Sequence, residues 1–595
     1  MSDSSSRILP LGLAVLLLVF SLWAGWFIHR SSFDVEGTHY YCLFDDAMIS
    51  MTYARNLVEG HGLEWARFGE PVEGFTHPLW MFLMVPVNAL PIPLRDRSLA
   101  VQLFSLLALA GTIAAVRRMM LDHFSPPGES HWLPAAVLTA FYYPLVYWSL
   151  MGMETGLQAL LAVVAAQLAL TTAHSGRDRS FALWVVCAAA FLLRMDMLLL
   201  VGVVQLYVLL HRGFRQIAAR RWLAGLAVFC GMTLAYGVFR KLYYHDVLPN
   251  TYYLKLYGVP LAVRLLRGSA VLAEFVHDNL LVLLAVGLGT AAFLRRNRRL
   301  ILPAALFVLY CAYSVYVGAD AWDDDLPIRA NRFISFVMPF LFVLLNAALN
   351  EALAISRGER RGREVAAGDP AGRFVLGAAA LAALLTVNGL WLSDKANDNW
   401  RELTLVERPP MTVRHQRVVG QLLAFEKLVK PGAVVATAWA GIPAYFSDYK
   451  MIDILGYNDR VVARMDPVTP LTEDNFDTFR PGHSKWNEQR LLTEQRPDAF
   501  FQIWGIKRGM GPVAKVMPSY GYRKAGKFWL RGDSPFVEAK GPAPAAEEEE
   551  PAAGNGDDTG DKAGDDKGDA GDSTPGDQAQ PNPRPRHPRH PQTGP

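Results

Sequence analysis

The sequence predicts a polytopic α-helical membrane protein that ends in a soluble α/β domain, and three observations support this fold class. First, 52% of the 595 residues are hydrophobic and only 19% are charged, with a mean hydropathy of +0.16. A soluble protein of this length needs more charge to cover its surface. Second, the hydrophobic residues are gathered into long blocks, as in transmembrane helices. Third, the long blocks stop near residue 392, and shorter apolar runs of strand length follow.

About eleven segments are apolar enough to be membrane spans, although some are shorter than the roughly 20 residues that usually cross a bilayer. The first, residues 9–28, could be a signal peptide, but it has no clean A-x-A cleavage site and is interpreted as a retained helix. The others are residues 98–116, 133–150, 157–173, 181–193, 197–210, 222–239, 279–294, 300–318, 333–350 and 374–392.

The basic residues between these spans predict the orientation. Cytoplasmic loops of membrane proteins are enriched in Lys and Arg. If every arginine-bearing connection is cytoplasmic, the spans pass in pairs, the N-terminus is inside and the C-terminal domain is outside. The apolar segment 79–94 is short and carries three prolines, and counting it as a span would invert every later loop. We therefore expect an interfacial or re-entrant helix there. The connections are Arg117–Arg118, Arg177–Arg179, Arg212–Arg221, 295–299 and 357–363.

The chain divides into three predicted parts. In the soluble part, apolar runs at 433–441 and 450–456 predict buried strands, and the spacing at 415–429 predicts a helix. The last part is acidic, then rich in Pro, Arg and His, and it lacks apolar residues to bury, so we expect disorder. The parts are a membrane domain at 1–392, an α/β domain at 393–540 and a low-complexity tail at 541–595.

Charge and cysteine content narrow the function classes. The net charge is only +3, which gives no support to nucleic-acid binding. The four cysteines form no CxxC pair and no Cys/His cluster, so neither a disulfide framework nor a zinc site is predicted. We expect no cofactor and no metal site, and a divalent cation is left open.

The strongest candidate for chemistry is the first outer loop, residues 29–97. It contains the adjacent acids Asp45 and Asp46, and apolar residues after them recur at helical spacing, so a helix should begin at the pair. One interpretation is that an acid only caps this helix. The other is catalytic. Glycosyl transfer needs a carboxylate to accept the acceptor's proton or to stabilise oxocarbenium-like charge, and a lipid-phosphate donor holds its reacting carbon just above the bilayer.

Other outer segments supply partners for such an acid. Glu154 lies between two spans, and Arg194 with Asp196 lies at a hairpin; ionisable residues at the membrane edge are functional candidates. The alternative is a structural salt bridge between Arg194 and either acid. Arginine's forked donors suit a phosphate.

Two later loops remain open to more than one interpretation. The loop after residue 240 is rich in tyrosine, which fits an interfacial belt or sugar stacking, and Lys255 could meet a phosphate. This loop is basic although it is placed outside, so either the topology is wrong there or its cations serve an anionic ligand. Residues 323–325 are three acids that fit a divalent cation or a solvated turn.

The candidate site residues follow from these loops. The catalytic candidates are Asp45 and Asp46. The substrate-binding candidates are Arg55, Glu73, His77, Glu154, Arg194, Asp196, Tyr253, Lys255, Arg329 and Arg332.

The loop DDAMISMTYARNLVEGHGLEW…EPVEGFTHPLW, with GMETGLQALL, LLRMDMLLL, LPNTYYLK, RANRFISFVMPFL and HSKW, resembles GT-C membrane glycosyltransferases, in particular terminal arabinofuranosyltransferases. The resemblance covers nearly everything before the tail. It implies a GT-C-like fold in the bacterial inner membrane, with the active site facing the periplasm or the outside. It also implies a polyprenyl-phosphate sugar donor, membrane lipid around the site, and a glycan, lipid or protein acceptor.

Two other function classes fit the sequence less well. A transporter or flippase of lipid-linked sugars predicts related halves and charged or broken segments near the membrane midplane. The sequence shows no repeat, and its polar residues gather at one predicted face. A catalytically silent assembly protein is disfavoured only because both acids are present.

Overall fold

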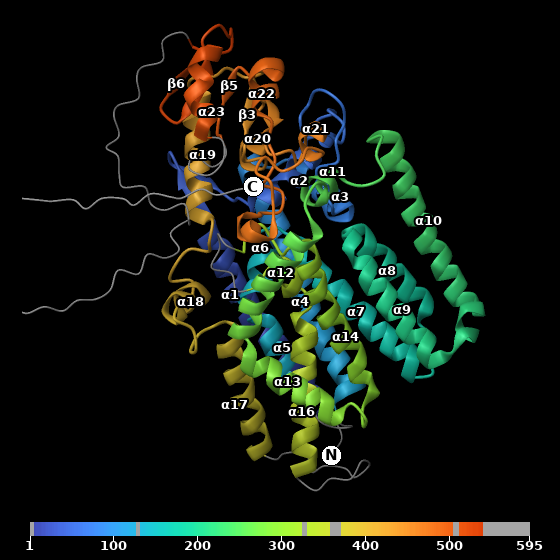
Figure 1. The fold of residues 1–595 in the computed structure, drawn as a ribbon. Coiled ribbons are helices and arrows are strands. Elements are labelled where there is room, and N and C mark those ends of the chain that lie inside the picture. The colour runs from blue at the N-terminus through green and yellow to red at the C-terminus, as the bar shows by residue number, and fades with distance from the viewer. Residues whose placement is uncertain (1–4, 126–130, 324–329, 357–369, 504–510, 539–595) are drawn as a thin grey trace, which may run out of the picture. The chain divides into compact units, whose positions relative to one another are not determined.

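The computed structural model describes residues 5–125, 131–323, 330–356, 370–503 and 511–538, all within one compact unit. The membrane part is α-helical, and each of the eleven predicted spans coincides with helix (Figure 1). Its helices of eight or more residues include α1 (Ser5–Ser31), α4 (Arg97–Met119), α5 (Leu133–Ala140), α6 (Tyr143–Leu150), α7 (Thr155–His174), α8 (Ser180–Leu193), α9 (Leu198–Arg212), α10 (Arg220–Tyr243), α12 (Leu261–Asp278), α13 (Leu280–Phe293), α14 (Ile301–Val317), α16 (Met338–Ser356) and α17 (Pro370–Val387).

The described helices include enough apolar length to confirm the polytopic class. Seven are long and apolar enough to cross a membrane, or up to nine if each bent pair is one span. The bent pairs are α5 with α6, at 48°, and α12 with α13, at 85°. Helices α8 and α17 are apolar but shorter, so the predicted count of eleven exceeds the number that pass by length and composition.

Two helices lie in the predicted outer loops. Helix α3 (Pro78–Asn88) has 11 residues with Pro86 inside it. At about 1.5 Å per residue it is too short to cross a hydrocarbon core of roughly 30 Å. Helix α12 was expected to be part of an outer loop, but it is an 18-residue helix. Its charged residues lower the mean hydropathy of the segment, so it is not among the predicted spans. Its apolar side packs on the membrane helices.

The basic connections meet at one end of the helices. The Arg299 guanidinium donates to the carbonyl oxygen of His123, at the end of α4, over 3.2 Å. Arg221, in α10, donates to the carbonyl of Asp178, just before α8, over 3.3 Å. Each contact joins two connections, and a hydrogen bond between the Thr171 hydroxyl, near the end of α7, and the His123 ring over 3.3 Å links the two pairs. Helices α4, α7, α9 and α13 therefore all run toward the same end. Residues 357–363 lie outside the described part of the chain.

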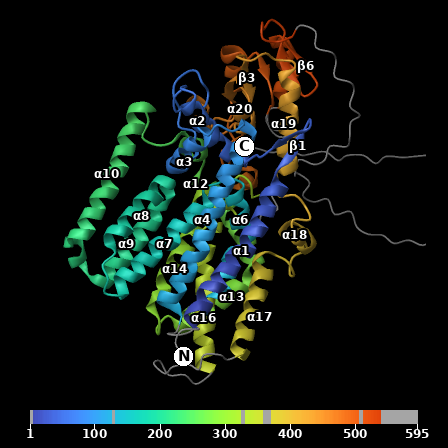
Figure 2. The ribbon, with the colours of Figure 1, turned by 180° about the vertical axis from the view of Figure 1, so that it is seen from behind.

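The first outer loop forms a small hairpin and two helices at the opposite end. Strands β1 (Phe33–Val35) and β2 (Thr38–Tyr40) pair antiparallel. Helix α2 (Asp45–Val58) follows and begins at the acid pair, as predicted. The hairpin lies beside α19 of the C-terminal domain, and Gln416 donates to the carbonyl of Asp34 over 2.9 Å (Figure 2).

The C-terminal domain is built on a five-stranded mixed sheet in the order β4-β3-β5-β7-β6. Strand β3 runs parallel to β4 and β5, while β7 runs antiparallel to β5 and β6. The predicted strands and helix are present as β3, β4 and α19. The strands are β3 (Val434–Thr437), β4 (Lys450–Asp453), β5 (Ala499–Phe500), β6 (Tyr522–Ala525) and β7 (Phe528–Arg531), and the helices include α18 (Ala396–Leu403), α19 (Thr412–Glu426), α20 (Ile442–Phe446), α21 (Arg460–Ala463), α22 (Glu488–Arg490) and α23 (Gly511–Val516).

This domain packs on the first loop through buried polar contacts. The Trp65 indole donates to the carbonyl of Ala440 over 2.8 Å. Arg55 donates to the carbonyls of Tyr445 and Ser447 over 2.7 and 3.0 Å. Because buried polar groups need partners, these bonds fix the domain's place on α2.

Candidate active site

Helix α2 sends its two first acids in different directions. Its N-cap residue is Phe44, with no side-chain cap, so neither Asp45 nor Asp46 caps α2. At 3.6 residues per turn, adjacent helical side chains point about 100° apart. Asp45 turns toward the C-terminal domain, where its carboxylate accepts hydrogen bonds from the backbone N–H groups of Gly441 and Ile442 over 3.2 and 2.8 Å.

Asp45 therefore caps a helix after all, but the helix is α20 in another domain. The approach is close enough to require glycine, since a Cβ on Gly441 would lie 2.0 Å from the Asp45 carbonyl oxygen. Burial raises the pKa of Asp45 to about 7, although the hydrogen bonds from Ile442 and Gly441 oppose that shift. Asp45 does not line the cavity described next.

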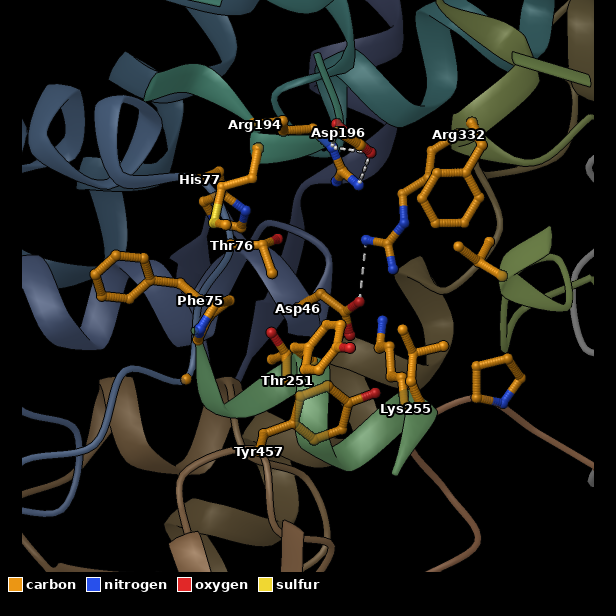
Figure 3. Close-up of a pocket in the computed structure, with 18 of the residues that line it drawn as sticks. Asp46, Phe75, Thr76, His77, Arg194, Asp196, Thr251, Lys255, Arg332 and Tyr457 are labelled. Carbon is orange, nitrogen blue, oxygen red and sulfur yellow. Dashed lines mark hydrogen bonds and ion pairs between the residues drawn. The ribbon is translucent and has the colours of Figure 1, made fainter. Parts of the chain in front are cut away.

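Asp46 faces a cavity of about 190 Å³ at the end of the helices that lies away from the basic connections (Figure 3). Its side chain is 16% exposed. The cavity combines apolar walls with a few convergent charged groups, as ligand sites do. Its polar and aromatic lining includes Asp46, Ser50, Phe75, Thr76, His77, Arg194, Asp196, Thr251, Tyr252, Lys255, Tyr313, Arg332, Phe333 and Tyr457.

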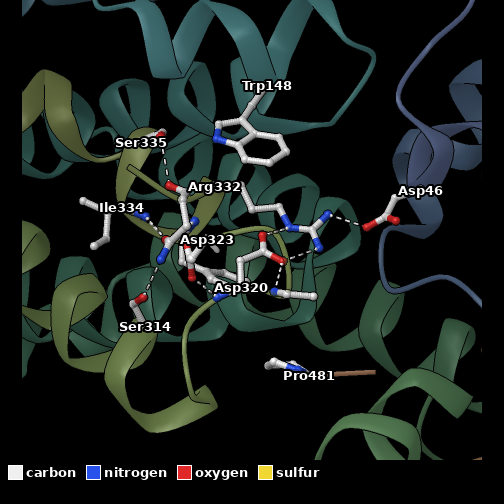
Figure 4. Close-up of polar contacts among 12 residues, drawn as sticks. Asp46, Trp148, Ser314, Asp320, Asp323, Arg332, Ile334, Ser335 and Pro481 are labelled. Atoms are coloured by element: carbon white, nitrogen blue, oxygen red, sulfur yellow. Dashed lines mark hydrogen bonds and ion pairs between the residues drawn. The ribbon is translucent and has the colours of Figure 1, made fainter. Parts of the chain in front are cut away.

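Arg332 is held between two carboxylates on one side of the cavity. Its Nη1 lies 3.2 Å from Asp46 Oδ2, and its Nε lies 2.7 Å from Asp320 Oδ2 (Figure 4). The Asp320 side chain is only 1% exposed. Burial alone would raise the pKa of Asp320, but the charges of Arg332 and Lys255 hold it below the usual value. The arginine is thus pre-positioned with one edge toward Asp46.

A local cap orients this arginine. Asn331 begins the short helix α15 (Arg332–Ser335), and its side chain accepts hydrogen bonds from the backbone N–H groups of Phe333 and Ile334. The Trp148 indole donates to the carbonyl of Ala330 over 3.0 Å. Within residues 330–335, this cap and the start of α15 send Arg332 toward the cavity.

A second ion cluster lies on the other side. The Arg194 guanidinium contacts Glu154 over 2.5 Å and Asp196 over 2.7 Å. Burial would raise the pKa of Glu154, yet the charges of His77, Arg194 and Arg332 bring it to about 2. The His77 ring bonds to the Ser50 hydroxyl over 2.6 Å, and burial lowers its pKa. This cluster contains the predicted Arg194 salt bridge, and it also lines the cavity.

Lys255 reaches the same cavity from α11 (Asn250–Leu256) and, unlike Arg194 and Arg332, is not bound to a carboxylate of the described residues. Its ammonium has no hydrogen-bond or ion-pair partner among the described residues, and it lies 5.8 Å from the centre of the Tyr457 ring. Burial lowers the pKa of Lys255 to about 8, with Arg332 adding to the effect and Asp320 opposing it. An unpaired cation beside Asp46 suits an anionic group of a ligand.

The structure separates the other candidates from this cavity. Arg55 is occupied by backbone carbonyls and by Glu59 and Asp448. Glu73 pairs with Arg240 over 2.5 Å. The Tyr253 hydroxyl donates to Asp246 over 3.0 Å. These side chains join loops to helices, and Arg329 lies outside the described residues.

The basic outer loop is explained by the same contacts. Arg240 pairs with Glu73, while Arg264 and Arg267 donate to the carbonyls of Tyr316 and Gly318, at the end of α14. Among the loop's described cations, Lys255 is the one that lines the cavity. Most of the basic residues that depart from the positive-inside rule in this loop therefore bind other parts of the protein and not a ligand.

Sequence reasoning missed two residues that the structure places at the site. Asp320 lies three positions before the acidic run 323–325, which drew the attention in the sequence and of which only Asp323 is described. Tyr457 comes from the C-terminal domain, and no local sequence pattern indicates that it lies close to Asp46. Among the described residues, no group of three or more His, Cys, Asp or Glu side chains is placed to hold a metal ion.

The fold and the cavity thus define a polytopic membrane protein with a charged cavity at one end of its helices. Residues 409–536, within the C-terminal domain, match a family described as a domain of unknown function (DUF8728). A search of curated proteins finds no match.

Eight chains of solved structures are similar to this chain. One is the crystal structure of ArnT from Cupriavidus metallidurans in the apo state, at 14% sequence identity and a TM-score of 0.46. The similarity covers 82% of this chain and 93% of that chain. The function proposed below is argued from the residues of the cavity.

Proposed function

We propose that this protein is a GT-C-type membrane glycosyltransferase that moves a sugar from a polyprenyl-phosphate donor to a glycan, lipid or protein acceptor. The observation that best supports this proposal is the position of the Asp46 carboxylate. Its carboxylate faces a cavity at the membrane-helix ends, between the cations Arg332 and Lys255. The motif resemblance of the first outer loop favours arabinofuranose as the sugar.

Each charged group at the cavity has a role in the proposed transfer reaction. Asp46 accepts the proton of the acceptor hydroxyl as its oxygen attacks the anomeric carbon. The bond from that carbon to the phosphate oxygen breaks, and both bonding electrons leave with the polyprenyl phosphate. Lys255 stabilises the negative charge that grows on this leaving group, while Arg332 stays paired with Asp46 and Asp320. The proton passes from Asp46 to solvent afterwards.

The proposed side of the membrane follows from the two ends of the helices. The described basic connections meet at one end, and the cavity lies at the other. By the positive-inside rule the basic end faces the cytoplasm. The cavity and the C-terminal domain then face the periplasm or the outside of a bacterial inner membrane.

The test is Asp46→Asn in purified protein, with a synthetic polyprenyl-phosphate sugar as donor. The amide keeps the size of the side chain but cannot accept the proton, so we expect the transfer rate to fall by about a hundred- to ten-thousand-fold. The matched control is Asp122→Asn, since that acid pairs with Arg118 on the surface at the opposite end. The control should keep its rate and melting temperature.

Two results would overturn the proposal. One is a folded Asp46→Asn protein with the parent's rate. The other is movement of an intact lipid-linked sugar across vesicles without any transfer, which would favour the flippase alternative.

A further inference from the structure

A lysine outside the cavity, Lys485, is buried, and no carboxylate of the described residues is bound to its ammonium. The residue is 1% exposed. Its Nζ donates to three backbone carbonyls, those of Tyr253, Tyr257 and Ala463, over 3.0, 2.7 and 2.9 Å. An ammonium has three N–H donors, so each finds one acceptor. Such a buried charge is costly unless its hydrogen bonds are complete.

Two of these carbonyls belong to the C-terminal end of α11, the helix that carries Lys255. Tyr253 lies in its last turn, and Tyr257 is its C-cap residue. The last carbonyls of a helix lack partners within it, and a cation there is favourable. Ala463 belongs to α21 of the C-terminal domain. Lys485 therefore ties α11 to that domain at a point two residues from Lys255.

The other end of α11 is tied to the same domain. The Asn250 amide donates to the carbonyls of Gly456 and Tyr457 over 2.8 and 2.9 Å. Because α11 has only seven residues, bonds at both ends determine its position. A helix this short does not hold its place by its own hydrogen bonds.

The chain just before Lys485 also touches the cavity wall. Pro481 lines the cavity. Gly482 has φ +83°, and a Cβ there would lie 2.4 Å from the Tyr457 hydroxyl oxygen and 3.5 Å from Lys255 Cε. The segment 481–485 thus packs directly against the stem of Lys255.

We propose that Lys485 is a positioning residue: by fixing the C-terminal end of α11 to the C-terminal domain, it holds Lys255 in the cavity where the donor phosphate binds. The phosphate-binding part of this inference rests on the proposed function, whereas the positioning of Lys255 does not. The role needs a charged ammonium. Burial lowers the pKa of Lys485 to about 8, with Asp466 opposing the shift, so the group is still protonated at neutral pH.

The test uses Lys485→Met in the full-length protein, which keeps the length of the side chain and removes its three donors. The first readout is acetylation of Lys255 by acetic anhydride as a function of pH, followed by peptide mass spectrometry. In the parent the midpoint should lie near pH 8, the pKa of Lys255. In the variant α11 loosens and Lys255 becomes hydrated, so the midpoint should move up toward the ordinary lysine value of about 10.4.

The second readout is transfer kinetics. We expect KM for the donor to rise by about tenfold or more, equivalent to roughly 1.4 kcal/mol of lost binding, with a smaller change in kcat. The control is Lys427→Met, because Lys427 forms an exposed pair with Glu36 and does not line the cavity. It should change neither readout.

The outcomes are distinguishable. An unchanged labelling midpoint in folded Lys485→Met overturns the positioning role, whatever the enzyme does. If the midpoint shifts in the variant and the parent protein itself transfers no sugar, the positioning role is supported and the proposed function is overturned. If Lys485→Met does not fold, Gly482→Ala tests the same idea, since its methyl group pushes the segment off Tyr457 without removing a buried donor. An unchanged midpoint in that variant also overturns the proposal.

Discussion

At the scale of single residues, adjacent side chains in this protein have separate surroundings. Asp45 is bound by backbone N–H groups of α20, while Asp46 faces the cavity and Arg332. The sequence identified the pair and the start of α2. It left the choice between capping and catalysis open because the partner of Asp45 is almost four hundred positions away along the chain.

Asp45→Asn should therefore affect stability more than chemistry. The amide can accept one of the two backbone N–H bonds but turns its own N–H toward the other. We expect the free energy of unfolding to fall by about 1–2 kcal/mol, with most of the transfer rate retained. Thermal unfolding in detergent and the transfer assay measure the two effects. A rate loss as large as that of Asp46→Asn would show that both acids act in the reaction.

Lys255 should give transfer an alkaline limit. Its pKa of about 8 lies below that of an ordinary lysine, so the cation is present below pH 8 and is lost as the pH rises through that value. The ratio kcat/KM, which reports groups of the free enzyme, should fall above pH 8. Lys255→Met should lose roughly 10- to 150-fold in affinity for the donor at neutral pH, the worth of a charged hydrogen bond.

The matched variant is Lys255→Arg, which stays protonated throughout this range. Its activity at pH 7 need not equal the parent's, since the forked guanidinium has a different shape. The fall of kcat/KM above pH 8, the alkaline limb of the pH profile, should nevertheless be absent in this variant. A limb that persists in Lys255→Arg would assign the titration to another group.

At the scale of elements, the short segments at the cavity depend on one another. Helices α2, α11 and α20 are held by contacts between domains. Periodicity predicted α2 and α19 and the two strands β3 and β4, because each has a continuous apolar face. It did not predict α12, whose arginines bond to carbonyls of α14, nor the closeness of α20 to α2. Such contacts depend on the folded arrangement, which local pattern does not encode.

Gly441→Ala tests the contact between α2 and α20. Its added methyl group would meet the Asp45 backbone at 2.0 Å, so the two helices must separate. Overpacking of this kind typically costs about 1–3 kcal/mol. The control is Gly420→Ala in α19, where the nearest atom would lie at an ordinary 3.6 Å. That change should be neutral or slightly stabilising. Equal melting temperatures for both variants would argue against the close contact.

At the scale of the whole molecule, the sequence predicted the fold class well because membrane spans are long and apolar. Hydropathy overestimated the number of spans among the described residues, since α8 and α17 are short and two pairs are bent. The cavity itself could not be predicted as a unit. Its charged groups come from α2, the ends of α8 and α14, α11 and α15, and Tyr457 comes from the C-terminal domain.

The orientation predicts which surfaces face outward. In a Cys230→Ala background, which removes the exposed native cysteine, single cysteines are introduced by Arg215→Cys and Glu473→Cys. A membrane-impermeant maleimide should label Glu473→Cys in intact spheroplasts, and Arg215→Cys only after permeabilisation. Labelling of both from the same side would refute the proposed topology.

The pairing of charges in the cavity also bears on turnover. Among the described lining residues, the arginines already have carboxylate partners, and Lys255 alone is left to balance a ligand. A polyprenyl-phosphate sugar carries one negative charge, which one ammonium can match. The phosphate monoester released by transfer gains a second charge above a pKa of about 6. That excess charge faces Asp46, so the spent carrier should be a weak product inhibitor at neutral pH and a stronger one below pH 6.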